Sequence, residues 1–373
     1  MQMNEKLKRK IEAIFANRVN NLALEEFKNE VEADAREAYS DYQVSHPRAS
    51  EGEVIDHVLS DLGDLDAVID MIAGETTNQV YQMDGKISCH EDTPQGDQMP
   101  DVIQNVDVNV YAGQVFIMQG TGSQVKVEQV FNHEHAELAV VINETPQQYA
   151  VTMPRLSGRG LLGLFSATTS NRFKNVIKVE LPAHFKGVLN LKLNAGEVFM
   201  TDLVLQNQLD ITVSAGTLHV NRLEASELML TLLAGRAHLQ QVKVQRLVKG
   251  TVSAGELYLE QVEAKFDLNI AAGVVTGQRL IGSGHFDVNA GSLSLDWQTV
   301  DAQLDLTTAL GSIRVGFDSQ ASYTIQGYST LGLIRVLRPH QVQSSTGNLT
   351  AQVGNDPKFK VTAQTSFGNI TIR

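Results

Sequence analysis

The sequence is poor in the residues that mark several common classes of protein. Among 373 residues there is a single cysteine, Cys89, which excludes an intramolecular disulfide and therefore a disulfide-stapled secreted module. No stretch approaches the roughly 20 consecutive apolar residues of a membrane-spanning helix. No early segment has the apolar run of a signal peptide. These absences predict a cytoplasmic location, with a peripheral cell-envelope or surface location as the alternative.

The sequence also lacks the signals of enzymes and of nucleic-acid-binding proteins. Its formal net charge of −13 argues against nucleic acid as a partner. It contains no nucleophile elbow, phosphate-binding loop or zinc-protease motif, and Cys89 beside His90 lacks further metal ligands. A polysaccharide-active enzyme should carry stacked aromatic platforms, yet the tyrosine and tryptophan residues of the repeats are scattered, at Tyr258, Trp297, Tyr323 and Tyr328. We therefore predict a protein that is not an enzyme and that needs no cofactor or metal.

A short phrase built on glycine repeats through the C-terminal half of the chain. From Gly196 to Gly368 the phrase returns in nine intervals over 172 residues, a mean period of about 19 residues, which is typical of solenoids. An earlier copy surrounds Gly113. The glycines that the pattern assigns to corners of the chain are Gly113, Gly196, Gly216, Gly235, Gly255, Gly273, Gly291, Gly311, Gly332, Gly347 and Gly368.

The residues around each glycine alternate between apolar and polar. Two and four residues after Gly255 come Leu257 and Leu259, while Ile270 and Leu268 lie three and five residues before Gly273. From the apolar position three residues before the glycine to the one two residues after it is a step of five residues, which is an odd number. Side chains of a strand alternate between its two faces, so both positions can face the core only if the chain turns at the glycine. Glycine suits a corner because it accepts positive φ and close backbone approach. We expect two or three short strands per repeat, stacked into a right-handed parallel β-solenoid or β-helix with coils of about 19 residues and a rod of roughly 48 Å.

Residues 1–74 show helical periodicity instead. Ser50 and Glu53 form a capping-box pattern ahead of an apolar helical stripe. Between Glu25 and Glu75 the chain has fifteen acidic and three basic residues, whereas residues 6–10 are mostly basic. We predict a small all-α bundle, whose charges are either solvated faces or a surface that docks a basic partner, with the first helix on anionic lipid.

This bundle resembles a known signalling domain. The segment Ala49-Ser50-Glu51-Gly52-Glu53-Val54-Ile55, followed by Leu59-Ser60-Asp61-Leu62-Gly63-Asp64 and Val68-Ile69, is similar to the end of the HAAS-type helical domain of bacteria. The resemblance covers about fifty residues. It implies a regulatory or envelope-stress role.

The remaining organisation follows from breaks in these patterns. Residues 75–101 lack a sustained period and read as a linker, and residues 102–373 read as the solenoid domain. An insertion loop at 154–175 interrupts the rhythm. In this loop cations flank apolar residues. It is either a candidate interaction loop for anionic lipid, a cell-wall polymer or the acidic N-terminal bundle, or an insertion folded back on the coils. Its residues are Arg155, Arg159, Leu161, Leu162, Leu164, Phe165, Arg172 and Lys174.

The repeats carry a second resemblance. Residues 176–182, followed by Leu189-Asn190-Leu191-Lys192-Leu193-Asn194-Ala195-Gly196-Glu197-Val198, resemble the bacterial putative-adhesin family of β-strand-repeat proteins, a domain of unknown function. The resemblance extends over about 102–373 and implies no catalytic residues.

Together these patterns predict a binding protein. We expect a non-enzymatic, envelope-associated sensor or scaffold whose solenoid presents a binding surface and whose helical domain docks a regulatory protein partner. The alternative is an adhesin-like surface module that binds cell-wall or host polymer. Because the chain closes on a strand at 370–373, we expect a weak homo-oligomer through an open C-terminal edge, or a local cap from the 356–360 loop.

Overall fold

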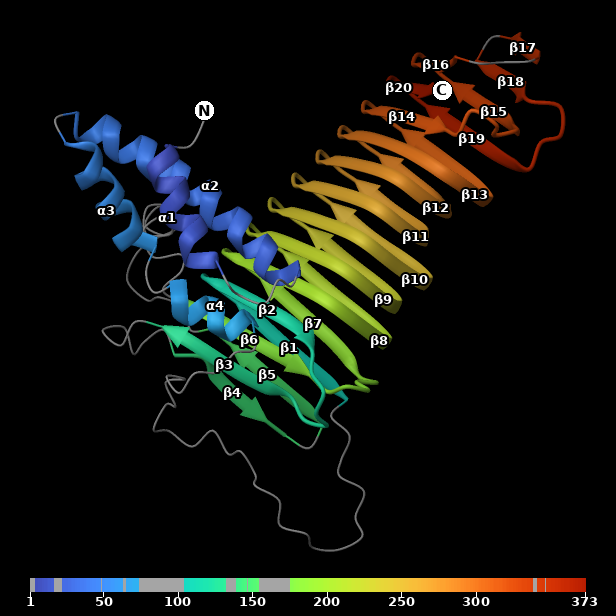
Figure 1. Cartoon of the computed structure of the whole chain (residues 1–373). Helices are drawn as coiled ribbons and strands as arrows, with labels where there is room; N and C mark the ends of the chain where they lie inside the picture. Colours follow the sequence, from blue (N-terminus) through green and yellow to red (C-terminus); the bar gives the residue numbers. More distant parts are fainter. Residues whose placement is uncertain are drawn as a thin grey trace, which may run out of the picture. The chain divides into compact units, whose positions relative to one another are not determined.

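The computed structural model describes residues 4–16, 22–47, 49–62, 65–73, 104–131, 139–145, 147–153, 175–337, 341–345 and 347–373. These fall into two compact units: unit 1 comprises Met1–Gln104 and Val110–Ala183, and unit 2 comprises Asn105–Asn109 and His184–Arg373. The predicted linker at 75–101 lies outside the described residues, as do residues 154–174 of the predicted insertion loop. The fold is mainly β, with a small N-terminal helical part (Figure 1).

The described residues of the helical part of unit 1 form four helices, in keeping with the all-α bundle that the periodicity predicted: α1 (Glu5–Phe15), α2 (Leu22–Ser45), α3 (Glu51–Leu62) and α4 (Leu65–Ala73). The capping box at α3 is present, because the Ser50 amide and hydroxyl both donate to Glu53 Oε2, at 2.7 and 2.9 Å. The apolar stripes meet in a small core that includes Leu7, Phe27 and Val58.

The basic residues of α1 are engaged within the bundle. Lys6 forms an ion pair with Glu51, and Lys10 Nζ lies 3.1 Å from Asp56 Oδ1, so two cations of α1 face the acidic helix α3. These pairs are exposed and contribute little stability. Lys6 and Lys10 of α1 are therefore already paired with acidic residues of α3.

The strands of unit 1 are β2 (Gln114–Gln119), β3 (Lys126–Phe131), β4 (Val141–Glu144), β5 (Gln148–Thr152) and β6 (Asn175–Leu181). Strand β6 pairs in parallel with β2 and antiparallel with β3, while β4 and β5 form an antiparallel hairpin. The ring of Phe27 from α2 meets Phe116 of β2 edge-on, with centroids 6.0 Å apart. Helices and strands therefore share one apolar core in unit 1.

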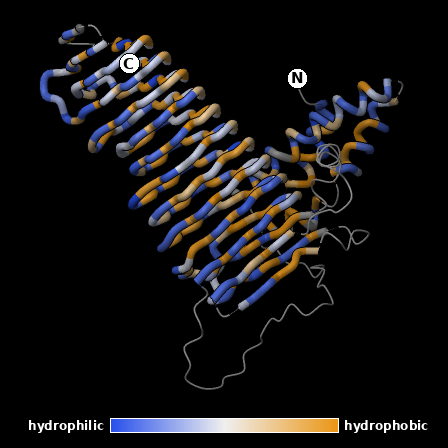
Figure 2. Tube along the Cα trace, turned by 180° about the vertical axis from the view of Figure 1, so that it is seen from behind, coloured by the Kyte–Doolittle hydropathy of each residue, from blue (hydrophilic) through white to orange (hydrophobic). Residues whose placement is uncertain are grey.

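Unit 2 is a stack of long parallel strands (Figure 1). The stack contains β7 (Val188–Leu193), β8 (Glu197–Val213), β9 (Thr217–Leu232), β10 (Arg236–Val252), β11 (Glu256–Ile270), β12 (Val274–Val288) and β13 (Ser292–Thr308), and β1 (Asn105–Val110) pairs with β7. Buried and exposed residues alternate along the central strands, for example along β10 and β11. Hydrophobic and hydrophilic residues alternate along the stacked strands in Figure 2. The prediction of two or three short strands per coil is wrong, because each of β8 to β13 continues as one strand of 15–17 residues through its bend.

The corner glycines stack on one another, and close approach is the main reason for glycine. A Cβ on each of Gly216, Gly235, Gly255, Gly273, Gly291 and Gly311 would lie within 2.6 Å of the carbonyl oxygen of the corner glycine in the preceding coil. That carbonyl accepts a hydrogen bond from the residue after the next glycine, for example from the Glu256 amide to Gly235 at 3.0 Å. The expectation of positive φ holds at Gly113, Gly196 and Gly347 but is wrong for the regular corners, whose φ lies outside that region.

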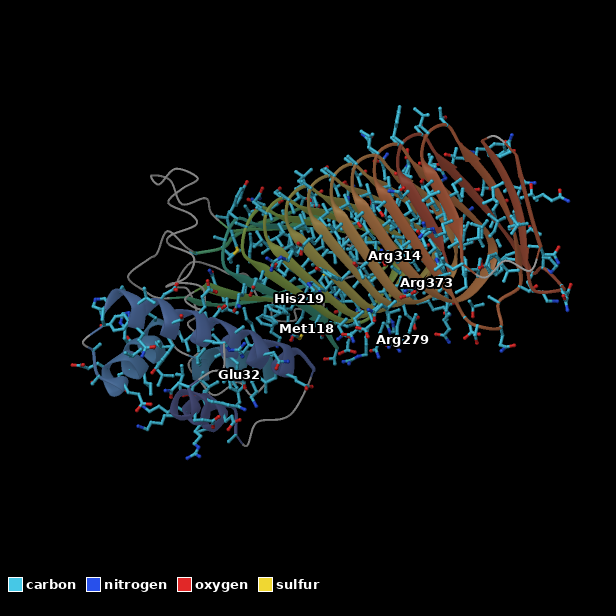
Figure 3. All side chains as sticks on the ribbon, turned by 90° about the horizontal axis from the view of Figure 1, so that it is seen from above. Glu32, Met118, His219, Arg279, Arg314 and Arg373 are labelled. Atoms are coloured by element: carbon cyan, nitrogen blue, oxygen red, sulfur yellow. The ribbon has the colours of Figure 1, made fainter. Side chains whose placement is uncertain are left out.

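A second bend lies six residues after the corner glycine in five consecutive coils. Its residues have left-handed backbone with φ of 52–54°, although none is glycine: Asp202, Arg222, Gln241, Gln261 and Arg279. An L side chain in this conformation is strained by about 1–2 kcal/mol. This bend turns the strand, and the pairing of neighbouring strands skips the bend residue, for example by passing from the pair Gln240 and Glu260 directly to the pair Val242 and Val262. Arg279 is labelled in Figure 3.

The C-terminal coils do not stack in chain order. The elements are β14 (Ser312–Phe317), β15 (Tyr323–Ser329), β16 (Leu333–Val336), β17 (Gln341–Ser345), β18 (Asn348–Val353), β19 (Phe359–Thr365) and β20 (Asn369–Ile372). Strand β20 lies between β14 and β16, and β19 lies between β13 and β15. The corner order in space is therefore Gly311, Gly368, Gly332.

Two expectations about this end are wrong. Gly347 is no corner of the stack, because it lies in the turn between β17 and β18, which pair antiparallel. The open edge expected at 370–373 does not exist either: Arg373 exchanges backbone hydrogen bonds with Val315 and Phe317, and β16 covers the other side of β20. The predicted homo-oligomer thus loses the edge on which it relied.

Candidate functional site

The outer face of the first coils of unit 2 carries a polar groove. Its residues lie mainly four and six positions before the corner glycines, where side chains alternate away from the core. The groove has a volume of about 530 Å³ and crosses β1, β7, β8 and β9. It is lined by Asp107, Asn109, Asn190, Leu191, Lys192, Gln208, Asp210, Ile211, Thr212, Met229 and Thr231. Four strands at a spacing of about 4.8 Å give it a length of roughly 14 Å.

Amides and carboxylates alternate along the floor of this groove. Asn190 Nδ2 donates to Asp107 Oδ1 at 2.6 Å, and Asn190 sits directly beside Asp210 in the pairing of β7 with β8. Gln208 Nε2 donates to Asp210 Oδ1, also at 2.6 Å. An ionised carboxylate only accepts hydrogen bonds, whereas an amide both donates and accepts. The row Asp107, Asn190, Asp210 therefore offers both functions within two strand spacings.

The remaining side chains complete a surface suited to neutral polar groups. Thr212 and Thr231 add hydroxyl groups, Met229 adds one apolar surface, and Lys192 opposes two carboxylates with one positive charge. Among the described residues that line the groove, none has an aromatic ring on which a sugar could stack. Hydrogen bonding, and not stacking or a strong charge, would fix a ligand here.

A ladder of stacked rings, which the search of the sequence missed, lies three residues after the corner glycines. Phe199, His219, His238 and Tyr258 stack with centroid separations of 4.9, 5.3 and 4.6 Å and interplanar angles of 7–17°. The ladder passes from the buried Phe199 to the exposed Tyr258. The signal was present in the sequence at this shared offset, but the aromatic residues considered there were tyrosine and tryptophan alone, so Phe199 and the two histidines were left out.

The surroundings shift the pKa of two groups in this ladder. Partial burial lowers the pKa of His238, and the nearby Arg236 lowers it further while Glu256 partly opposes the change. The pKa of Tyr258 is raised by desolvation and by its hydrogen bond to Glu256, at 3.2 Å. A neutral His238 keeps the stack free of like charges near pH 7.

The structure places the residues that the sequence singled out as follows. The glycines predicted as corners lie at turns that precede a strand, and all except Gly347, which lies in an antiparallel hairpin, precede a strand of the parallel pairings. All eight residues of the candidate interaction loop, from Arg155 to Lys174, lie outside the described residues. Of the carboxylates searched on the outer face, Asp210 lies in the groove, whereas Asp267 and Asp305 are at the same offset in later coils and do not line it. Asp107 and Asn190 were missed because the search covered only carboxylates, and only those beyond residue 188.

In the part of the chain described above, no three carboxylate, imidazole or thiol side chains converge to form a metal site. Within the same residues, none of the helices combines the length and the apolar character needed to cross a membrane.

Comparison with known proteins gives one family and two solved structures. The model of the Toastrack DUF4097 family matches residues 103–373. No curated protein sequence matches the chain. A structure of a putative cell adhesion protein from Clostridium sporogenes is 9% identical, with a TM-score of 0.21 and coverage of 74% of this chain and 95% of that one. A structure of a putative adhesin from Bacteroides fragilis is 12% identical, with a TM-score of 0.37 and coverage of 73% and 93%.

Proposed function

The chain belongs to the Toastrack DUF4097 family, and from the geometry of its solenoid we propose that it is a non-enzymatic binding protein for a hydroxyl-rich polymer of the cell envelope or of a host surface. The observation that supports this proposal most directly is the groove floor, where Asn190 lies between Asp107 and Asp210. Hydroxyl groups both donate and accept hydrogen bonds, as this row requires. The names of the two solved structures are compatible with such an adhesin-like role.

The shape of the groove supports a chain-like ligand. It crosses four parallel strands, and an extended polymer would present a similar group to each coil in turn. Binding by backbone-positioned polar side chains without an aromatic platform predicts modest affinity and a need for several contacts.

Calorimetric titration with soluble envelope polysaccharides tests the proposal. The variants Asn190→Ala and Asp210→Asn should each lose about tenfold in affinity, because a group built to hydrogen-bond a ligand is costly to leave unpaired. Asp267→Asn is the matched control, since Asp267 has the same offset and partial burial but lies outside the groove. Equal affinity of Asn190→Ala and the unaltered chain for a polysaccharide would refute the site.

A second candidate function concerns the helical part. We propose that it docks a regulatory protein, as its resemblance to HAAS-type domains implies, with the solenoid acting as sensor or scaffold. The supporting observation is the acidic helix α2, which carries Glu25, Glu32, Glu37 and Asp41 with few cations. A pull-down from source cells, with the full chain as bait, tests this second proposal. The unaltered chain should capture a basic protein partner, and the variant that carries both Glu37→Lys and Asp41→Lys should no longer capture it.

A further inference from the structure

The C-terminal corners of the solenoid carry large apolar side chains in a position that elsewhere holds alanine. The residue before the corner glycine is Ala215, Ala234, Ala254, Ala272 and Ala290 in successive coils. In the last three coils it is Leu310, Phe367 and Leu331, with exposed fractions of 66%, 59% and 73%. Side chains this exposed contribute little to folding, so the stability of the coils does not explain the change.

These three side chains form one row. The Phe367 amide donates to Ala309 at 2.8 Å and the Leu331 amide donates to Ser366 at 2.8 Å, which sets Phe367 between Leu310 and Leu331 in neighbouring coils. Leu333, half exposed on the edge strand β16, extends the row beyond the glycine. The row is convex, because it sits on the outside of successive corners, and it spans about 10 Å at a coil spacing of about 4.8 Å.

Positive charge borders the row. Residues 309–314, 366–371 and 330–335 contain Arg314 and Arg335 and no carboxylate. Both arginines are exposed and neither forms an ion pair within the described residues. Asp296, which lies beside Gly316 in the pairing of β13 with β14, forms an ion pair with Arg373 at 2.8 Å. Figure 3 labels Arg314 and Arg373 near this end of the stack.

From this combination we infer that the Leu310–Phe367–Leu331 row is a docking surface for an anionic lipid bilayer. Convex apolar side chains enter the boundary between headgroups and acyl chains, while arginines remain at the anionic headgroups. The chain as a whole carries a net charge of −13, which repels an anionic bilayer. The two arginines at this corner remove that repulsion locally, so an anionic bilayer can approach here. A second copy of the chain fits less well, because a two-fold contact would bring two pairs of arginines together.

Cosedimentation of the full chain with vesicles tests this inference. The chain should bind vesicles of phosphatidylcholine with 30% phosphatidylglycerol and bind vesicles of phosphatidylcholine alone at least tenfold more weakly. Binding should fall as salt rises from about 0.1 to 0.5 M, because screening weakens exposed charge interactions. Equal binding to both vesicles, or none to either, would overturn the inference.

Two variants assign the binding to this corner. Leu331→Ala with Phe367→Ala restores the residue found at the other corners and should lower vesicle affinity about tenfold. Arg314→Gln with Arg335→Gln should lower it comparably and flatten its dependence on salt. Leu233→Ala is the control, because Leu233 is an exposed apolar residue at an earlier corner of the same stack.

Sedimentation equilibrium without lipid and circular dichroism complete the test. All variants should keep the spectrum of the unaltered chain, since the replaced residues are exposed. If the unaltered chain self-associates and the alanine variant is monomeric, the row is a contact between copies and the lipid assignment is wrong.

Discussion

Replacing Gly255 by alanine tests the physical reason for the glycine repeat. A Cβ at this position would lie 2.5 Å from the Gly235 carbonyl oxygen and 2.7 Å from Leu232 Cγ. Neither neighbour can move freely: the carbonyl accepts the Glu256 amide at 3.0 Å, and Leu232 is buried. The two coils must therefore separate locally.

The magnitude follows from two contributions. Overpacking of a tightly packed site costs about 1–3 kcal/mol, and weakening one buried backbone hydrogen bond costs about 1 kcal/mol. We expect Gly255→Ala to lower the free energy of unfolding by about 2–4 kcal/mol. Because φ at Gly255 is not positive, Gly255→Asn should be worse than alanine. If positive φ were the reason, asparagine would instead be the better tolerated replacement.

Urea unfolding followed by circular dichroism and by the fluorescence of Trp297 measures this change in unit 2. Gly52→Ala is the matched control, because nothing lies within 4 Å of its Cβ position in α3. That variant should stabilise the helix by roughly 0.5–1 kcal/mol. A loss of less than about 1 kcal/mol for Gly255→Ala, or a smaller loss for asparagine, would refute the close-approach argument.

Three further predictions concern other features of the two units. Gln261→Gly should raise the free energy of unfolding by about 0.5 kcal/mol, since relief of left-handed strain outweighs the added freedom of the unfolded chain, whereas Gln261→Val should lower it; urea titration distinguishes them. His238 has a lowered pKa in the folded chain, so the unfolded chain binds more protons and stability falls as pH drops below about 6.5; thermal unfolding from pH 7.5 to 5 should show a smaller decline for His238→Phe. The lowered pKa of Glu53 comes from hydrogen bonds donated by Ser50; the helicity of α3 should therefore decline as pH falls below about 4.5, an effect that Glu53→Gln abolishes in amide exchange measurements.

The solenoid was predictable because every regular corner requires a residue without a Cβ, and this requirement repeats at a fixed spacing in the sequence. A glycine every 19 residues or so, with apolar residues at fixed offsets, follows from coils that approach within van der Waals contact. The second bend was not predictable, because Asp202, Arg222 and Gln241 share no residue type. The strand pairings before and after the bend hold its left-handed conformation. The strain therefore favours no single polar residue type at this position.

Coil order and the groove show a different limit. The segments around Gly332 and Gly368 fit the repeat equally well, and nothing local says that Gly368 stacks on Gly311. Likewise, alternation along the sequence is compatible with outward positions for Asp107 and Asn190, but it could not show that β1 pairs with β7. Contacts between segments about 80 residues apart depend on which edges meet, and periodicity carries no information about that choice.

The placement of β20 between β14 and β16 also constrains how the chain can assemble during synthesis. Coils up to β14 can be added one after another as the polypeptide emerges, because each needs only its predecessor. Strand β16 is synthesised before β20, but the strand with which it pairs is β20, which lies between β16 and β14. Strand β16 therefore remains unpaired until β20 has been synthesised. A nascent chain stalled before Asn369 would thus hold two unsatisfied strand edges, and a premature stop there would leave a product prone to mispairing and accessible to proteolytic quality control.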